Sequence, residues 1–309
     1  MNNFEIRPQE IYLLERYSSA EYFKQLVGAF KNMLDAAERA LDVFILDLPD
    51  NYRDRHISEQ SDVVWGEMVL PNFRSTMDSL NYGYQRLLEG DLSALQYAGN
   101  VLTDFRAQRI DFWPDWMDED NLALFDKWQA KASKLATNIK ATIFGSWPIT
   151  FLTEKYNSDY LGELNLPESL PIYRQHPTIS IKTDETVPQD GFYIPIIADA
   201  CAQFMLKGHD ASEALVGLDA EYGGIQYDHK EPTKWILVER IADEGGSLAT
   251  MNVSALKGFV GQKCTQSGNW WSLANESQSR YFKQGDIFPE IKNNTWGETI
   301  WYLEVTNKE

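Results

Sequence analysis

The stretch from 111 to 120 holds the densest group of side chains that could bind a partner. It reads Asp-Phe-Trp-Pro-Asp-Trp-Met-Asp-Glu-Asp, with carboxylates at Asp111, Asp115, Asp118, Glu119 and Asp120 and indoles at Trp113 and Trp116. Tryptophans anchor many protein interfaces, and carboxylates attract basic surfaces. The segment is therefore a candidate contact for a basic protein.

A structural role for the same segment stays open. Asp118, Glu119 and Asp120 would complement the positive end of a helix that begins there, and the aromatic rings could close the end of a helical bundle. A metal site built from Asp111 and Asp115 is less favoured, because no histidine lies near them.

No catalytic motif accompanies this segment. The sequence contains no glycine-rich phosphate loop, no G-x-S-x-G elbow and no H-E-x-x-H helix. The histidines and cysteines are too far apart in sequence to form a compact metal motif: His56, His176, His209, His229, Cys201 and Cys264. Lys263 beside Cys264 would favour a thiolate, but a nucleophilic cysteine also needs a positioned base. We predict a protein that is not an enzyme and that carries no metal or cofactor.

The net charge of the chain indicates which kinds of partner are not expected. The 309 residues carry a net charge of -18, spread over both halves. Such a field repels phosphate backbones and anionic lipid, so nucleic acid and membranes are not expected as partners. Solubility is an alternative reason for the acidity. The start of the sequence lacks the basic and apolar regions of a secretory signal, and no apolar run is long enough for a membrane span, which predicts a cytoplasmic location.

Helical spacing of apolar residues dominates residues 1–150. A Ser18–Glu21 capping box predicts a first helix that ends before Pro49. A second helix is expected from about 58 to 88 with a kink at Pro71, a third from Asp91, and a fourth from Asp118 to Gly145. Four amphipathic helices with short connections predict an antiparallel bundle.

Residues 151–178 are rich in proline and predict a linker, and residues 179–309 predict a β-rich domain with an internal repeat. The stretch 187–193 matches 264–270 at a constant shift of 77 residues (187 to 264), and the match continues to Gly208 and Gly285. Both copies end in Trp-x-Leu, at Trp235 and Trp301. The expected fold class is α+β, with the helical bundle followed by a duplicated small, bent, SH3-like sheet module at about 180–243 and 257–309.

The β-rich part resembles a family of bacterial proteins. The stretches 235–246, 264–271 and 280–289 are similar to the immunity proteins of polymorphic toxin systems of the family 71/72 type, although Thr265 stands where the family has proline. The resemblance implies an antidote that binds the toxin domain of a type VI or related secreted effector, and it brings no catalytic or metal-binding residues.

Taken together, these features predict an immunity protein that neutralises its cognate toxin by stoichiometric binding, with a basic and possibly nucleic-acid-degrading toxin domain as its partner. The predicted contacts are the 111–120 segment together with Trp270 and Trp271. Two alternatives remain: an enzyme that removes a toxin-installed modification, and a peptide-binding adaptor with aromatic grooves around Tyr193 and Trp270.

Overall fold

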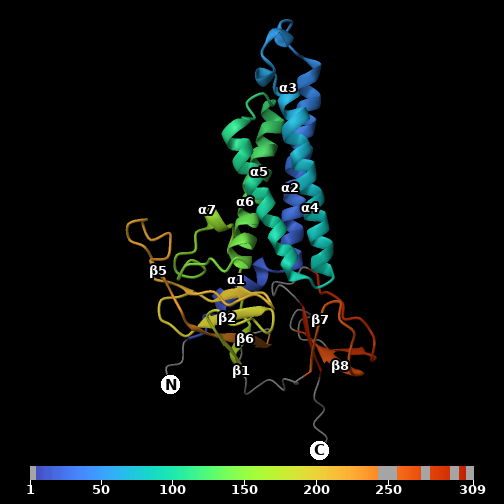
Figure 1. Cartoon of the computed structure of the whole chain (residues 1–309). Coiled ribbons are helices and arrows are strands. Elements are labelled where there is room, and N and C mark those ends of the chain that lie inside the picture. The colour runs from blue at the N-terminus through green and yellow to red at the C-terminus, as the bar shows by residue number, and fades with distance from the viewer. Residues whose placement is uncertain (1–4, 243–255, 273–278, 293–298, 304–309) are drawn as a thin grey trace, which may run out of the picture. The chain divides into compact units, whose positions relative to one another are not determined.

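The computed structural model describes residues 5–242, 256–272, 279–292 and 299–303. It is α+β as predicted, with helices in the first half and small antiparallel sheets in the second (Figure 1). Internal contacts divide the chain into two units. The helical unit comprises Tyr17–Ser146 and Asn157–Gly162, and the β unit comprises Met1–Arg16, Trp147–Tyr156 and Glu163–Glu309.

Four helices form the body of the helical unit. They are α2 (Ala20–Leu46), α4 (Leu70–Leu88), α5 (Ala98–Asp111) and α6 (Glu119–Ile143), and successive members run in opposite directions (Figure 1). Their core contains three phenylalanines: the ring of Phe30 lies 5.8 Å from both Phe73 and Phe105. Shorter elements connect or flank them: η1 (Tyr52–Asp54), η2 (Ile57–Glu59), α3 (Ser61–Val64), η3 (Trp65–Val69), η4 (Leu92–Tyr97) and α7 (Ser158–Leu161).

Two local features of this unit bear on the sequence prediction. Ser19 rather than Ser18 caps α2, because the Ser19 hydroxyl accepts a hydrogen bond from the Tyr22 N–H at 3.1 Å. Around Pro71 the helix is not regular: helical backbone runs from Ser61 to Leu88, and a π-helical turn, η3, directly precedes α4, in which Pro71 is the second residue.

The first helix, α1 (Pro8–Tyr17), belongs largely to the β unit and not to the helical domain expected for residues 1–150. The Glu10 carboxylate accepts a hydrogen bond from the Ala202 N–H at 2.6 Å, and Glu15 accepts one from the Tyr173 hydroxyl at 2.8 Å. These partners lie more than 150 residues further along the chain, so local sequence could not reveal them. The expected linker 151–178 also differs, because β1 already begins at Ile172.

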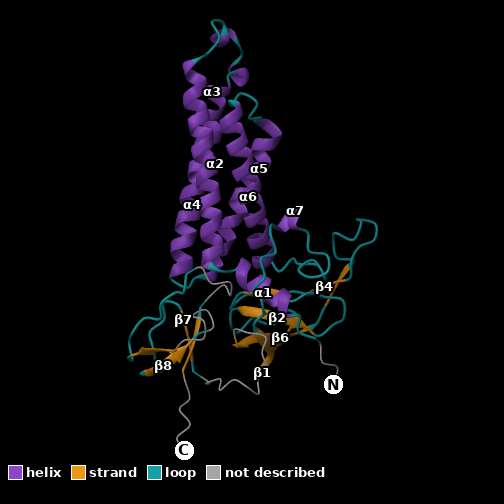
Figure 2. Ribbon diagram, turned by 180° about the vertical axis from the view of Figure 1, so that it is seen from behind, coloured by secondary structure: helices purple, strands orange, loops and turns teal. Residues whose placement is uncertain are grey.

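The β unit contains two four-stranded antiparallel sheets with equivalent strand orders. Figure 2 draws their strands in orange. The first module has the order β1-β6-β2-β3, formed by Ile172–Lys182, Lys234–Ala242, Gly191–Pro195 and Gln203–Met205. The second has the order β7-β10-β8-β9, formed by Lys257–Phe259, Ile300–Leu303, Gly268–Trp271 and Ser279–Phe282. The first module also carries a two-stranded sheet, β4 (Ala214–Val216) with β5 (His229–Glu231).

Equivalent residues build the two cores. Six pairs of equivalent residues are buried in both modules: Val187 and Cys264, Tyr193 and Trp270, Met205 and Phe282, Ala211 and Phe288, Trp235 and Trp301, Leu237 and Leu303. Their hydrogen bonds repeat as well. The Tyr193 hydroxyl donates to the Gln189 carbonyl at 2.7 Å, and the Trp270 indole donates to the equivalent Gln266 carbonyl at 3.1 Å. The repeat in the sequence is thus a repeat in packing.

One pair of core positions exchanges large and small residues between the modules. The first module has Ile181 with Ala211, and the second has Gly258 with Phe288. A Cβ atom on Gly258 would lie 2.0 Å from the Phe288 ring. Because cores tolerate substitution when their total volume is kept, the two combinations are alternative solutions to one packing problem.

This exchange gives a prediction for stability. Gly258→Ile should overpack the second core and lower the free energy of unfolding by about 1–3 kcal/mol, and Phe288→Ala should lower it by about 3–5 kcal/mol. The double variant has the same two residue types as the first module. Its loss in free energy of unfolding should therefore be clearly smaller than the sum of the two single losses. Urea unfolding followed by tryptophan fluorescence measures all three, and Gly99→Ala, whose new Cβ meets nothing within 4 Å, is the control. Additive losses would contradict the equivalence.

Candidate partner-binding surface

The 111–120 segment is the connection between α5 and α6. Asp111 is the last residue of α5, and Asp118 caps the start of α6. Between them the two tryptophans behave differently: Trp113 is 66% exposed, whereas Trp116 is half-buried. The segment therefore combines a solvent-facing indole with one that packs into the fold.

Trp116 attaches the connection to the rest of the helical unit. Its ring lies 5.4 Å from Phe44 near the end of α2 and 5.2 Å from Trp65 in the π-helical turn, with edge-to-face geometry in both contacts. Trp65 in turn contacts Phe125 of α6 at 5.8 Å. Residues 41–68 and 109–121 are thereby held together at one end of the bundle, which we call the Trp116 end (Figure 1).

The carboxylates of the segment divide into one structural residue and four exposed ones. The Asp118 carboxylate accepts hydrogen bonds from the Asn121 side chain at 2.8 Å and from the Asn121 N–H at 3.1 Å, and these bonds hold the pKa of Asp118 below its ordinary value. Asp118 is thus a helix cap, the role that the alternative interpretation predicted. The other four are exposed: Asp111, Asp115, Glu119 and Asp120.

The Trp116 end also exposes apolar residues that the sequence analysis did not single out. Several large hydrophobic side chains here are about half exposed or more: Val43, Ile45, Leu46, Ile57, Met68 and Ile110. Leu46 is 86% exposed. A signal was present in the run Val43-Phe44-Ile45-Leu46, because a helix cannot bury four consecutive side chains on one face.

The Trp116 end carries a surplus of negative charge. Besides the 111–120 carboxylates, its exposed acidic residues are Asp42, Asp47, Asp50, Asp54, Glu59 and Glu67. Arg53 is already engaged with the buried Asp62 through two bonds of 3.1 and 2.6 Å. The guanidinium groups of Arg53 and Arg55 also stack on the Tyr52 ring. The arginines thus hold the connection between α2 and α3 in place and offset few of the exposed carboxylates.

The other two predicted contact residues lie in the β unit, on the strand β8. Trp270 is fully buried in the second module's core, so it is a core residue rather than a contact for a partner. Trp271 is partly exposed and packs against Tyr302 with ring centroids 5.0 Å apart. Because it is buried, Trp270 is not part of the candidate surface.

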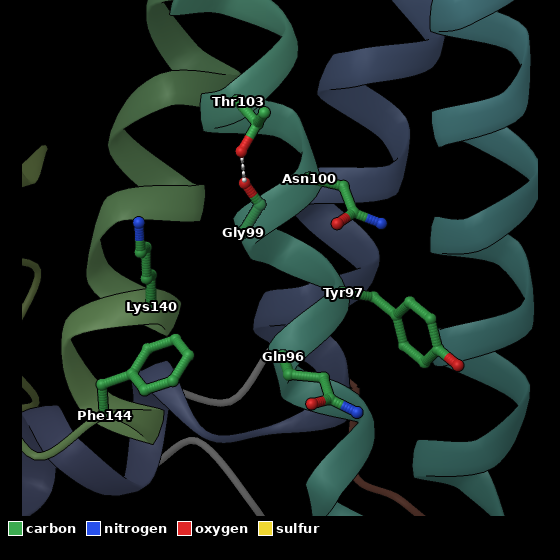
Figure 3. Close-up of a pocket in the computed structure, with 7 residues that line it drawn as sticks. All are labelled: Gln96, Tyr97, Gly99, Asn100, Thr103, Lys140 and Phe144. Carbon is green, nitrogen blue, oxygen red and sulfur yellow. Dashed lines mark hydrogen bonds between the residues drawn. The ribbon is translucent and has the colours of Figure 1, made fainter.

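A surface pocket of about 360 Å³ lies between η4–α5 and α6 (Figure 3). Gln96, Asn100 and Thr103 line one side, and Lys140 and Phe144 line the other. The Thr103 hydroxyl donates to the Gly99 carbonyl at 3.2 Å, so it is not paired with a base as a nucleophile would be. The pocket offers polar contacts but no assembled reaction chemistry.

Cys201 and the possible metal ligands among the described residues do not form a stronger candidate site than the Trp116 end. Cys201 is buried, and burial together with the nearby Glu10 carboxylate raises the pKa of its thiol well above the ordinary value, which disfavours a thiolate nucleophile. Within the described residues, no group of three or more histidine, cysteine or acidic side chains could hold a metal ion. In the same part of the chain, no helix has the length and apolar character needed to cross a bilayer.

Comparison with known proteins found no matching family model, no similar curated protein and no similar solved structure. The resemblance to polymorphic-toxin immunity proteins accordingly stays a prediction from the sequence.

Trp116 packs into the helical unit and Trp113 is exposed, so we predict that their removal changes the free energy of unfolding by different amounts. Trp116→Ala removes the ring that joins the α5–α6 connection to Phe44 and Trp65, so the free energy of unfolding should fall by about 2–4 kcal/mol. Trp113→Ala should change it by less than about 0.5 kcal/mol, because that side chain is mostly exposed. Thermal and urea unfolding of both variants measure the difference. Equal losses would show that Trp116 is not the anchor.

Proposed function

We propose that this protein is an antidote that neutralises a toxin by direct binding, and that the Trp116 end is its contact surface. The observation that supports the proposal is the combination at this end of exposed apolar side chains, led by Leu46 and Trp113, with exposed carboxylates such as Asp111 and Asp115. A monomeric surface rarely gathers large apolar residues without a binding role.

The two kinds of side chain contribute differently to such an interface. Burial of apolar area contributes about 25 cal/mol per Å², and a protruding indole such as Trp113 is suited to be an energetic anchor. The carboxylates add little affinity each, but they steer a basic partner and raise the association rate. Because Trp116 packing already fixes the connection, little ordering entropy is lost on binding.

A toxin domain that acts on nucleic acid fits this chemistry best, since its substrate site must be basic to receive phosphates. Carboxylates at the interface would then occupy the positions of substrate phosphates and block the site. The resemblance to immunity proteins of type VI and related systems supports the same assignment, with a cytoplasmic location where the toxin would act. As part of this proposal, the two modules of the β unit are SH3-like.

Co-expression tests the main claim. Cells that produce the effector toxin encoded beside this protein's gene should grow only when the protein is present at comparable amounts, because inhibition is stoichiometric. Protection at a small fraction of the toxin amount would instead indicate an enzyme that reverses a modification. Failure of the protein to restore growth at any level would refute the antidote function.

Variants of the Trp116 end test the proposed surface. Trp113→Ser should weaken the complex by about 2 kcal/mol or more as a central anchor. Asp111→Lys with Asp115→Lys should lower the association rate at least tenfold at low salt. Matched controls in the helical unit are Tyr160→Ser, at a side chain that is 75% exposed, and Asp78→Lys with Glu89→Lys, at exposed acids of α4 and its C-cap.

Calorimetry and surface-based kinetics with the purified toxin domain measure these effects. The control variants should bind as the unaltered protein does. If the Trp113 and Asp111/Asp115 variants also bind normally while growth is still protected, the antidote function would stand and the contact would lie elsewhere. Asp118 is left unaltered in this test because its carboxylate caps α6.

A further inference from the structure

The pocket between η4–α5 and α6 is a site that the proposed contact surface does not include. Its volume of about 360 Å³ lies within the range of small-molecule pockets, about 300–1,000 Å³. Figure 3 shows Lys140 and Phe144 on α6, opposite Gly99 and Thr103 of α5. All of its lining residues belong to the helical unit, so one compact part of the chain forms the whole pocket.

Gly99 leaves open space in this pocket, although the helix does not need a glycine there. It lies in the middle of the helical backbone that runs through η4 and α5, where a glycine costs about 0.5–1 kcal/mol relative to alanine. Its φ is outside the left-handed region, and a Cβ atom at this position would meet no neighbouring atom within 4 Å. Neither backbone conformation nor packing requires the glycine, so its missing side chain points to the pocket itself.

The charge of the pocket is opposite to that of the whole chain. Its lining includes the base Lys140 and no acid, and among the residues that the structure describes the Lys140 amine forms no ion pair. Asp104 of α5 is buried and accepts hydrogen bonds from Asn72 and Thr76 of α4. The surrounding stretch 127–153 contains no aspartate or glutamate, and its bases are Lys127, Lys131, Lys134 and Lys140. An anionic ligand therefore meets a local positive charge here.

An aromatic ring and two side-chain amides complete the lining. Phe144 is 64% exposed, and its ring points toward η4 (Figure 3). Gln96 and Asn100 each supply an amide with two N–H donors. Within the described part of the chain, neither amide bonds to another side chain, so both can donate to a ligand. The pocket thus combines a cation and neutral donors with an apolar face.

We propose that this pocket binds a small molecule in which a carboxylate is attached to an aromatic ring. The carboxylate pairs with the Lys140 amine, and the ring packs against Phe144 in the space beside Gly99. Hydrogen bonds to a charged group are stronger than neutral ones, but an exposed ion pair contributes modestly, so a single-ring ligand binds weakly and with preference for the anion. The pocket lies at the end of α6 and the Trp116 end at its start, so this activity is separate from toxin binding.

Fluorine NMR with the full chain tests the proposal. The probe is 4-fluorobenzoate, and the comparison ligand is 4-fluorobenzamide, which has the same size and ring but no charge. The benzoate should bind saturably in the millimolar range, as expected for so small a ligand, and about threefold more tightly than the benzamide. Absence of saturable binding by the benzoate, or equal binding of the two ligands, would overturn the proposal.

Variants of the pocket locate the binding. Gly99→Leu fills the open space and should abolish saturable binding of both ligands, without lowering the melting temperature. Lys140→Gln should lower the affinity for the benzoate about threefold, to that for the benzamide, and leave the benzamide affinity unchanged. The matched controls are Gly28→Leu, at a glycine of α2 whose Cβ would also meet nothing within 4 Å, and Lys131→Gln, at an exposed lysine of α6 outside the pocket. Both controls should bind as the unaltered protein does. Normal binding by Gly99→Leu, or an undiminished preference for the benzoate in Lys140→Gln, would overturn the assignment to this pocket.

Discussion

The edge-to-face packing of Trp116 against Phe44 and Trp65 is the contact on which the Trp116 end depends. It joins the α5–α6 connection to the end of α2 and to the π-helical turn before α4. The same connection that is tied down by Trp116 projects Trp113 into solvent three residues earlier. A single anchored indole thus lets an acidic loop be both ordered and accessible, which is what a preformed binding surface requires.

The two modules of the β unit share the features that their common fold requires. Equivalent core residues, equivalent indole and phenol hydrogen bonds, and the exchange of Ile181 with Ala211 for Gly258 with Phe288 are requirements of packing. The first module makes further contacts with the chain outside the repeat, because the Gln203 side chain binds the Trp147 backbone and the Ala202 N–H donates to the Glu10 carboxylate. These contacts join α1 and Trp147 to the first module and are separate from the packing that the two modules share.

The sequence predicted those parts of the structure that local patterns encode. Apolar periodicity located the four long helices, and the carboxylate at Asp118 located the start of α6. The sequence did not predict that α1 packs in the β unit, because Glu10 and Glu15 bind partners that lie more than 150 residues away in the chain. Nor could composition separate Trp113 from Trp116, or show that Trp270 is a core residue, since exposure is set by tertiary packing.

The sequence predicted only part of the candidate surface, because tertiary packing sets which other residues share that end of the bundle. The 111–120 segment stood out by composition, but the apolar residues of α2 that share its end of the bundle belong to a helix whose pattern otherwise indicates a core. Only the contacts of Phe44 and Trp65 with Trp116 bring the two segments together.

The most direct test of the central claim is amide hydrogen exchange of the full chain, alone and saturated with the purified toxin domain. The proposed function predicts slowed exchange in residues 41–68 and 109–121, with the largest change around Trp113. Slowed exchange confined to the β unit, with the Trp116 end unchanged, would contradict it.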